Sequence, residues 1–184
     1  MPTLNPPDPP LEDGVIALRG WRTSDAPDIA RMFQDPEALE WTRAPAPYRE
    51  GDARQWLASL PAMMRRGASL PLAVTDAGDG SLLGSIELRM QAEGRAEFGY
   101  VIAAWARGRG VGTRALTMLA RWAFDVLRLE RLEVLAQPGN EASQALAQRV
   151  GFTREGLLRA HSLVRGERKD MLMMSLLRGE LRED

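Results

Sequence analysis

Apolar residues recur along this chain with two different spacings. Over residues 49–66 and 113–127 they return every three or four positions, which indicates two amphipathic helices that face a core. Pro61 lies inside the first of these segments and predicts a kink there. Residues 24–34 predict a further helix, because Ser24 can cap its start.

Shorter segments have the alternating or continuous apolar pattern of β-strands. Polar, glycine-containing turns at residues 77–80 and 91–94 separate three of them, so these three strands are expected to form a meander. The expected strands are residues 15–18, 71–75, 82–90, 95–102, 131–136 and 171–177. The chain order is strand, two helices, three meandering strands, helix, strand, short helix and a final hairpin. This order predicts a mixed α+β fold around a single sheet.

The length and the ends of the chain set the expected domain organisation. The 184 residues suffice for one domain with a substantial core, expected over residues 14–184. Residues 1–13 are rich in proline and predict a flexible, extended tail rather than a signal peptide. Because no secretory signal or membrane-length apolar run is found, the expected location is the cytoplasm.

Charge and cysteine content exclude several classes of function. The formal net charge of −1 gives no general attraction to nucleic acid or to a membrane surface. The sequence has no cysteine, which rules out disulfides, thiolate nucleophiles and cysteine-ligated zinc. No histidine–carboxylate cluster has metal-ligand spacing, so no metal is expected.

A glycine-rich segment joins the strand at 95–102 to the helix at 113–127. It reads A-R-G-R-G-V-G, and glycines at such a turn let backbone N–H groups converge at the positive end of the helix dipole. The segment lacks the third glycine of the Rossmann fingerprint and the lysine of the P-loop. It fits the pattern R-x-x-G-x-G, with Arg107, Gly110 and Gly112 at the fixed positions. We therefore expect a phosphate-binding loop.

A second motif lies downstream, from Asn140 to Arg159. It has the pattern N-x-x-S-(x)6-V-G-F-x-x-E-G-x-L-R, and the segments at 18–30 and 171–177 accompany it. Together with the loop, these segments resemble the RimJ/RimL-type, ribosomal-protein branch of the GNAT N-acetyltransferase superfamily. The resemblance extends over nearly the whole chain. It implies the GNAT fold, a single, mostly antiparallel twisted sheet flanked by helices, in which two central parallel strands splay apart.

The resemblance also implies acetyl-CoA as co-substrate. Backbone N–H groups of the loop would hold the pyrophosphate, its arginines would add charge, and the preceding strand would pair with the pantetheine arm. A strand bulge is expected to open the slot for that arm, and a main-chain N–H near Ile102 would bind the oxyanion of the tetrahedral intermediate. The implied cofactor-binding residues are Val101, Ile102, Arg107, Gly108, Arg109, Gly110, Val111, Gly112, Thr113 and Asn140.

Proton transfer needs an acid for the leaving thiolate and a base for the amine. Many family members use a tyrosine as the acid, but its position holds Ala147 in this sequence. The RimL-like alternative is Ser143, which could also cap the helix that follows it. Glu97 is the candidate base, with Glu87 and relay through water as alternatives. His161 is expected either beside the acceptor site or as an ordinary surface residue.

These expectations describe an N-acetyltransferase that transfers the acetyl group of acetyl-CoA to a primary amine by direct attack in a ternary complex. The acceptor would be the N-terminal α-amine of a protein, such as a ribosomal protein, or the amine of a small molecule. The closing hairpin could support a homodimer. Two alternatives stay open: a non-catalytic acyl-CoA-binding or sensor domain of the same fold, and a nucleotide-binding module that uses the same loop.

Overall fold

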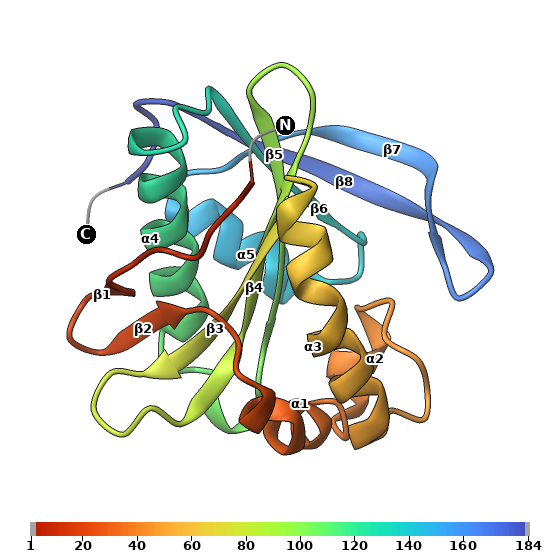
Figure 1. Cartoon of the computed structure of the whole chain (residues 1–184). Coiled ribbons are helices and arrows are strands. Elements are labelled where there is room, and N and C mark those ends of the chain that lie inside the picture. Colours follow the sequence, from red (N-terminus) through yellow and green to blue (C-terminus); the bar gives the residue numbers. More distant parts are fainter. Residues whose placement is uncertain (1–2, 183–184) are drawn as a thin grey trace.

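The computed structural model describes residues 3–182, and within them eight strands form one sheet (Figure 1). The sheet order is β1-β2-β3-β4-β5-β6-β8-β7, and every neighbouring pair is antiparallel except β5–β6. The strands are β1 (Leu11–Glu12), β2 (Ile16–Arg19), β3 (Ser69–Asp76), β4 (Leu82–Met90), β5 (Arg95–Ile102), β6 (Arg131–Ala136), β7 (Thr153–Val164) and β8 (Glu167–Leu177). This architecture confirms the expected mixed fold with a single, mostly antiparallel sheet.

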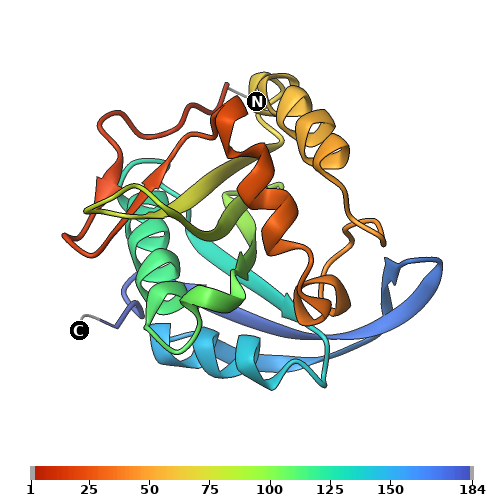
Figure 2. The same ribbon diagram turned by 90° about the horizontal axis from the view of Figure 1, so that it is seen from below.

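Helices cover both faces of this sheet. They are α1 (Ala26–Met32), α2 (Pro36–Glu40), α3 (Glu50–Arg65), α4 (Val111–Asp125) and α5 (Glu141–Val150), with 3-10 turns η1 (Thr23–Asp25) and η2 (Ala104–Ala106). Figure 2 shows α4 and α5 on one side of the sheet and α1 and α3 on the other. Alternation along β3 explains the two layers. Leu72 and Val74 are buried in the cluster that includes α4, whereas Ala73 is buried with α1 and α3.

The parallel pair β5–β6 separates before β5 ends. The two strands are paired only as far as Phe98 and Val134, whereas β5 continues to Ile102 beside β4 alone. The strands therefore splay apart as the resemblance implied. The expected bulge is wrong, because β4 and β5 pair along their whole overlap without a register shift. Beyond Phe98 and Val134, β5 pairs only with β4, and the last two residues of β6 pair only with β8.

The N-terminal segment packs on the rest of the protein instead of forming a free tail. The side chain of Leu4 is buried, and its N–H donates to the Met64 carbonyl of α3 over 3.0 Å. Leu11 and Glu12 pair with β2 as the edge strand β1, where proline-rich neighbours are tolerated. The expectation of a flexible tail over residues 1–13 is corrected on this point, and residues 1–2 lie outside the described part of the chain.

The predicted helices agree with the structure within two or three residues at most ends. α3 runs through Pro61, and α4 begins two residues before the expected position. The helix expected from Ser24 starts as the turn η1, because Asp25 anchors the chain there. Its carboxylate accepts from the Arg22 N–H at 2.8 Å and pairs with the guanidinium of Arg19. Within residues 3–182, every helix is too short or too polar to span a bilayer.

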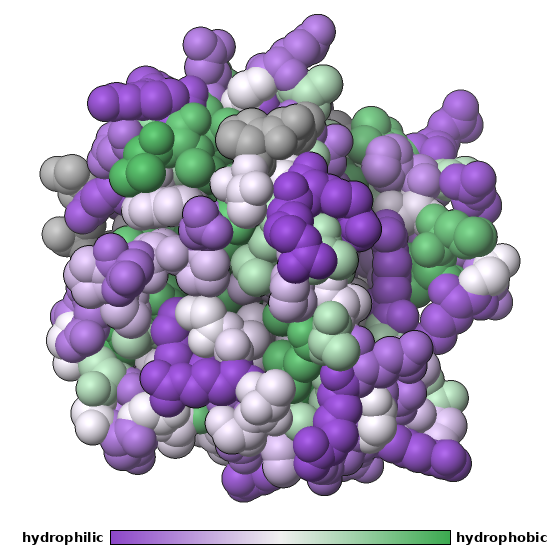
Figure 3. Space-filling view, viewed as in Figure 1, coloured by the Kyte–Doolittle hydropathy of each residue, from purple (hydrophilic) through white to green (hydrophobic). Residues whose placement is uncertain are grey.

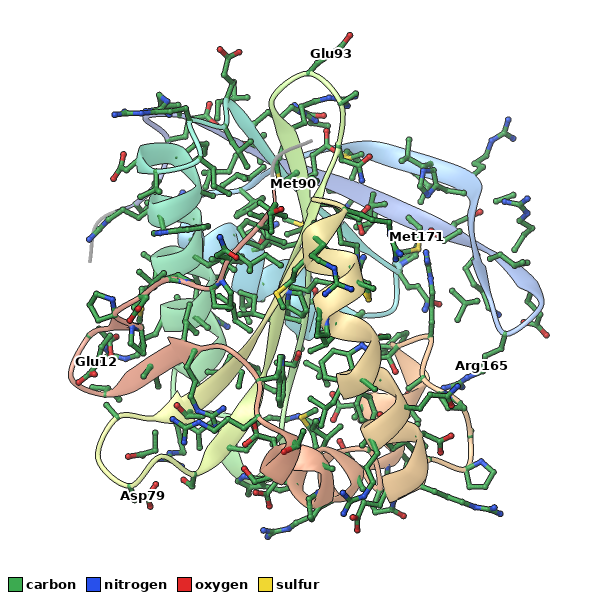
Figure 4. The ribbon with its side chains drawn as sticks, in the orientation of Figure 1. Glu12, Asp79, Met90, Glu93, Arg165 and Met171 are labelled. Atoms are coloured by element: carbon green, nitrogen blue, oxygen red, sulfur yellow. The ribbon has the colours of Figure 1, made fainter. Side chains whose placement is uncertain are left out.

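The last two strands form a long hairpin that projects from the sheet (Figure 1). β7 is the outer strand of the sheet, and its residues Leu157 and Leu163 are exposed. Figure 3 shows an apolar patch over this hairpin between hydrophilic residues. Arg165, in the turn of the hairpin, donates a hydrogen bond to the Leu39 carbonyl of α2 and is directed toward that helix in Figure 4. The homodimer expected from this hairpin stays a prediction.

Candidate active site

A cavity of about 670 Å³ lies where β5 and β6 separate. Its wall continues from these strands to the glycine-rich loop, the first turn of α4 and the start of α5. The sequence-predicted site residues in the wall are Glu97, Val101, Ile102, Arg107, Gly108, Gly110, Val111, Gly112, Thr113, Asn140 and Ser143. The fold thus brings together two motifs that are about thirty residues apart in the sequence, and Arg109 is the predicted residue that does not line the cavity.

The glycine-rich loop presents backbone N–H groups at the start of α4. Gly108 and Gly110 have φ angles of 73° and 74°, a left-handed conformation that favours glycine. Gly110 is the N-cap of α4, and the first N–H bonded back to it comes from Arg114 over 3.1 Å. The N–H groups of residues 111–113 therefore have no carbonyl partner within the helix. Because these residues line the cavity, the helix start can bind an anion there.

The end of β5 presents a further main-chain donor. Ala103, the residue after β5, donates its N–H to the Leu83 carbonyl of β4 over 2.9 Å. Since successive N–H groups of a strand point to opposite edges, the N–H of Ile102 faces the edge from which β6 has separated. The Ile102 carbonyl on this same edge accepts a 3.2 Å hydrogen bond from Arg107 Nε. An unpaired strand N–H thus faces the cavity that Ile102 lines.

Asn140 and Ser143 have different roles at the start of α5. The Oδ1 atom of Asn140 accepts from the Ser143 N–H at 3.0 Å, so Asn140 is the N-cap of the helix. Of the two roles that the sequence left open for Ser143, the capping role therefore falls to Asn140. The Ser143 hydroxyl is left for other contacts, and both residues line the cavity.

Tyr100 contacts that hydroxyl directly. The Tyr100 hydroxyl lies 2.8 Å from Ser143 Oγ and 3.2 Å from the Ser143 carbonyl oxygen. Burial raises the pKa of Tyr100 to about 12, so the phenol stays protonated throughout the neutral range. The pair therefore offers two hydroxyl groups at the junction of β5 and α5.

The family of the chain follows from comparison with known proteins. Residues 16–153 match the model of a family described as acetyltransferase (GNAT) domain. The chain belongs to the GNAT acetyltransferase family.

Similar proteins point to the RimJ/RimL-type branch of this family. YdaF of Bacillus subtilis (strain 168), named as a candidate ribosomal N-acetyltransferase, is 41% identical over 104 residues, which cover 55% of this chain and 57% of YdaF. A candidate ribosomal-protein-serine acetyltransferase from Vibrio cholerae has a TM-score of 0.85 at 26% identity, covering 94% of this chain and 99% of that one. Mycobacterium smegmatis RimJ in complex with CoA-disulfide has a TM-score of 0.80 at 29% identity, covering 93% and 86%. The resemblance expected from the motifs is confirmed.

This GNAT chain has no room for a tyrosine at the position of Ala147. Ala147 is completely buried in the core cluster that contains α4. Of the two tyrosines in the sequence, Tyr100 lines the cavity and Tyr48 does not. Tyr100 is therefore a site residue that the sequence did not single out, although it belongs to the same E-x-G-Y segment as Glu97.

Glu97 and Glu87, the two candidate bases, share one guanidinium. Arg89 lies 2.7 Å from Glu97 and 3.0 Å from Glu87, and all three side chains line the cavity. Gly99 makes this arrangement possible, because a Cβ there would lie 2.3 Å from Arg89 Nη2. The carboxylates are thus held in fixed positions on the strands β4 and β5.

The two arginines of the loop have carboxylate partners. Arg107 pairs with Asp35 and Glu37 at the start of α2, and Arg109 lies 3.9 Å from Asp76. Burial acts to raise the pKa of Asp35, but the hydrogen bond and charge of Arg107, together with backbone N–H donors, outweigh it and hold that pKa below its usual range. Arg107 therefore ties α2 to the loop, which the sequence did not predict. Its role toward the pyrophosphate stays a prediction.

α2 and the residues after it form one wall of the cavity and were missed by the sequence interpretation. Trp41, Thr42 and Arg43 line the cavity beside α2. A helix-start signal was present, since Asp35 precedes Pro36 and caps the helix by accepting from the Ala38 N–H.

His161 does not line this cavity, although its neighbour Ser162 does. Its Nδ1 atom lies 3.1 Å from Ser162 Oγ, beside an irregularity in the β7–β8 pairing. Across residues 3–182, no group of three or more histidine, aspartate or glutamate side chains could hold a metal ion.

Replacing Tyr100 by phenylalanine is expected to lower kcat about threefold to tenfold and to leave the KM for acetyl-CoA nearly unchanged. The substitution removes one hydrogen bond to Ser143 and leaves the ring in place, and such a bond contributes about 1 kcal/mol. Steady-state kinetics of CoA release measures both constants. A raised KM with an unchanged kcat would instead assign Tyr100 to cofactor binding.

Proposed function

We propose that this chain transfers the acetyl group of acetyl-CoA to a primary amine, without a covalent enzyme intermediate. One observation carries the proposal: the unpaired N–H groups of the α4 start, the outward edge of β5 and the Ser143 hydroxyl line one cavity. Such an arrangement provides an anion site, a slot for an extended chain and a proton donor. Membership of the GNAT family supports it.

Acetyl-CoA would bind along the separated edge of β5 and onto the loop. The N–H groups of residues 111–113 and the left-handed turns at Gly108 and Gly110 would hold the pyrophosphate. Val101 and Ile102 would lie along the pantetheine arm, and Asn140 would fix the start of α5 beside it. The RimJ relative that is 29% identical is a complex with CoA-disulfide, which supports the same class of cofactor.

Transfer would proceed by direct attack of the amine nitrogen on the thioester carbonyl carbon. The C–N bond forms, the carbonyl oxygen becomes an oxyanion, and the C–S bond then breaks. The Ile102 N–H would stabilise the oxyanion, because it faces the cavity without a strand partner. Ser143 would donate its proton to the leaving thiolate and regain one from the attacking nitrogen, which carries a surplus proton once the C–N bond has formed, with Tyr100 holding the hydroxyl in place.

The amine must lose a proton to attack. Glu97 would accept it, either directly or through water, from its place beside Arg89. The acceptor would be the N-terminal α-amine of a protein or the amine of a small molecule. The names of the ribosomal relatives support the first class.

Release of the CoA thiol from acetyl-CoA, measured against a panel of amines, tests the proposal. The panel contains peptides with varied N-termini, free amino acids, a polyamine and single small amines. Release with any of them, dependent on the amine concentration, is the expected result. Binding of acetyl-CoA without thiol release from any amine would overturn the proposal in favour of a sensor domain.

A further inference from the structure

A second cavity, of about 590 Å³, adjoins the first. The two share four lining residues on β4 and after α2: Thr42, Arg43, Ser85 and Glu87. The second cavity therefore opens onto the part of the first cavity where Glu87 and Arg89 lie. If acetyl-CoA occupies the first cavity as proposed, the acceptor amine must approach from another direction, and the second cavity provides that approach.

Aromatic rings dominate the wall of this second cavity. The rings of Trp21 and Trp56 meet edge to face with centroids 5.2 Å apart, and those of Phe33 and Tyr48 lie 4.6 Å apart. α3 presents one of its faces to the same space, through Asp52, Gln55, Trp56 and Ser59 at helical spacing. Four rings around a volume of this size suit a large apolar group.

The carboxylates in the wall already have partners. Asp52 accepts from the Arg49 N–H at 2.7 Å, and Glu87 pairs with Arg89 at 3.0 Å. Burial, followed by the charge of Asp52, raises the pKa of Tyr48 to about 12, so its ring stays neutral. Arg43 adds a positive charge at the exposed rim. Of the two carboxylates, Glu87 is thus already paired with a guanidinium, and the positive charge of Arg43 at the rim opposes the approach of a polycation.

One donor in the wall lacks a partner. The Nε1 atom of Trp21 is buried and has no hydrogen-bond partner among residues 3–182. A buried indole N–H normally finds one. Because this Nε1 atom is closed to solvent, Trp21 presents apolar ring atoms to the cavity.

We propose that the second cavity binds a large apolar or aromatic group of the acceptor, so that the preferred substrates are aromatic primary amines rather than polyamines. The inference rests on the proposed acetyl transfer, and it adds the substrate class. Trp56 and Trp21 would determine the specificity by contacting this group, while the amine itself points through the shared opening toward the thioester.

A series of amines with the same aminomethyl end tests this proposal: ethylamine, phenethylamine and tryptamine, with spermidine as the polycation. We expect kcat/KM for the aromatic amines to exceed that for ethylamine at least about tenfold, because apolar pockets discriminate by that order. Trp56→Ala should remove this preference, because it should lower kcat/KM for the aromatic amines at least about tenfold and kcat/KM for ethylamine much less. Trp56→Phe should restore most of the preference. Trp122→Ala is the matched control, since Trp122 belongs to α4, packs against the core cluster and lines neither cavity.

A second measurement separates this inference from acetyl transfer itself. Calorimetric titration of phenethylamine into the CoA-saturated protein should show binding that Trp56→Ala abolishes and Trp122→Ala retains. Three results would each overturn the aromatic site and leave the proposed acetyl transfer unaffected. They are equal kcat/KM for all amines, a preference for spermidine, and phenethylamine binding that is unchanged in Trp56→Ala. Binding at Trp56 without thiol release from any amine would uphold the site and overturn the proposed transfer.

Discussion

Replacing Gly110 by glutamate is expected to raise the Kd for acetyl-CoA at least about 100-fold. Gly110 is the N-cap of α4, and a side chain there would begin beside the N–H groups proposed to hold the pyrophosphate. A carboxylate within about 4 Å of a phosphate charge is repelled by about 4 kcal/mol at an effective dielectric constant of 20. Since about 1.4 kcal/mol corresponds to tenfold in affinity, even half of this repulsion exceeds a tenfold loss, and the lost N–H contacts add to it.

Two further variants separate the effect of charge from that of backbone strain. Gly110 has a φ of 74° and nothing within 4 Å of an added Cβ, so Gly110→Ala introduces the strain of about 1–2 kcal/mol without the charge. Gly179→Glu places the same side chain at another left-handed glycine with open space around it. Gly179 lies away from the loop, because its neighbour Arg178 contacts the Phe124 carbonyl near the C-terminal end of α4, whereas the loop precedes the N-terminal end of that helix. Calorimetry with acetyl-CoA measures all three, and full affinity in Gly110→Glu would show that the loop does not hold the pyrophosphate.

The features that the sequence predicted correctly depend on local chemistry. The glycines predicted a turn whose backbone N–H groups converge, and Gly108 and Gly110 have the left-handed backbone that such a turn allows. The apolar spacing of residues 113–127 likewise identified α4, because its buried stripe faces one continuous layer of the sheet. The parallel β5–β6 pair and its splay came from the family resemblance, since no local pattern encodes which strands are neighbours.

The features that the sequence missed depend on contacts between distant segments. Arg107 was assigned to the pyrophosphate, yet its partners Asp35 and Glu37 lie about seventy residues earlier in the chain. The proline-rich residues before β1 were predicted to form a free tail. Leu4 is buried and bonded to Met64, a residue far along the chain, and no local sequence pattern indicates such a contact. Trp56 lies in the segment 49–66, whose apolar spacing predicted a helix that faces a core, and such spacing does not separate the wall of a cavity from a packed core.

The start of α5 shows how one contact decides between two roles that a sequence cannot separate. Asn140 and Ser143 are both good capping residues, and either could begin the helix. The 3.0 Å bond from the Ser143 N–H to Asn140 Oδ1 gives the cap to Asn140. The serine thus contributes its backbone to the helix start and its hydroxyl to the contact with Tyr100.

Replacing Ser143 by alanine is accordingly expected to lower kcat about 100-fold and to change the KM for acetyl-CoA little. A positioned general acid contributes roughly 100-fold or more to such a step. The backbone N–H that Asn140 caps is unaffected by the substitution, and alanine is a good helix former, so the melting temperature should stay within about 2 °C of the parent. Steady-state release of CoA and a thermal melt measure these quantities.

Ser143→Thr provides the matched control, because it keeps a hydroxyl at the same place on α5 and should retain most of the activity. Tyr100→Phe combined with Ser143→Ala supplies the second test. If Tyr100 acts only by holding the serine, the double variant should be no slower than Ser143→Ala alone, since the hydroxyl that Tyr100 positions is already gone. A double variant slower by the full product of the two single effects would show that Tyr100 acts independently, and an unchanged kcat in Ser143→Ala would remove the serine from proton transfer altogether.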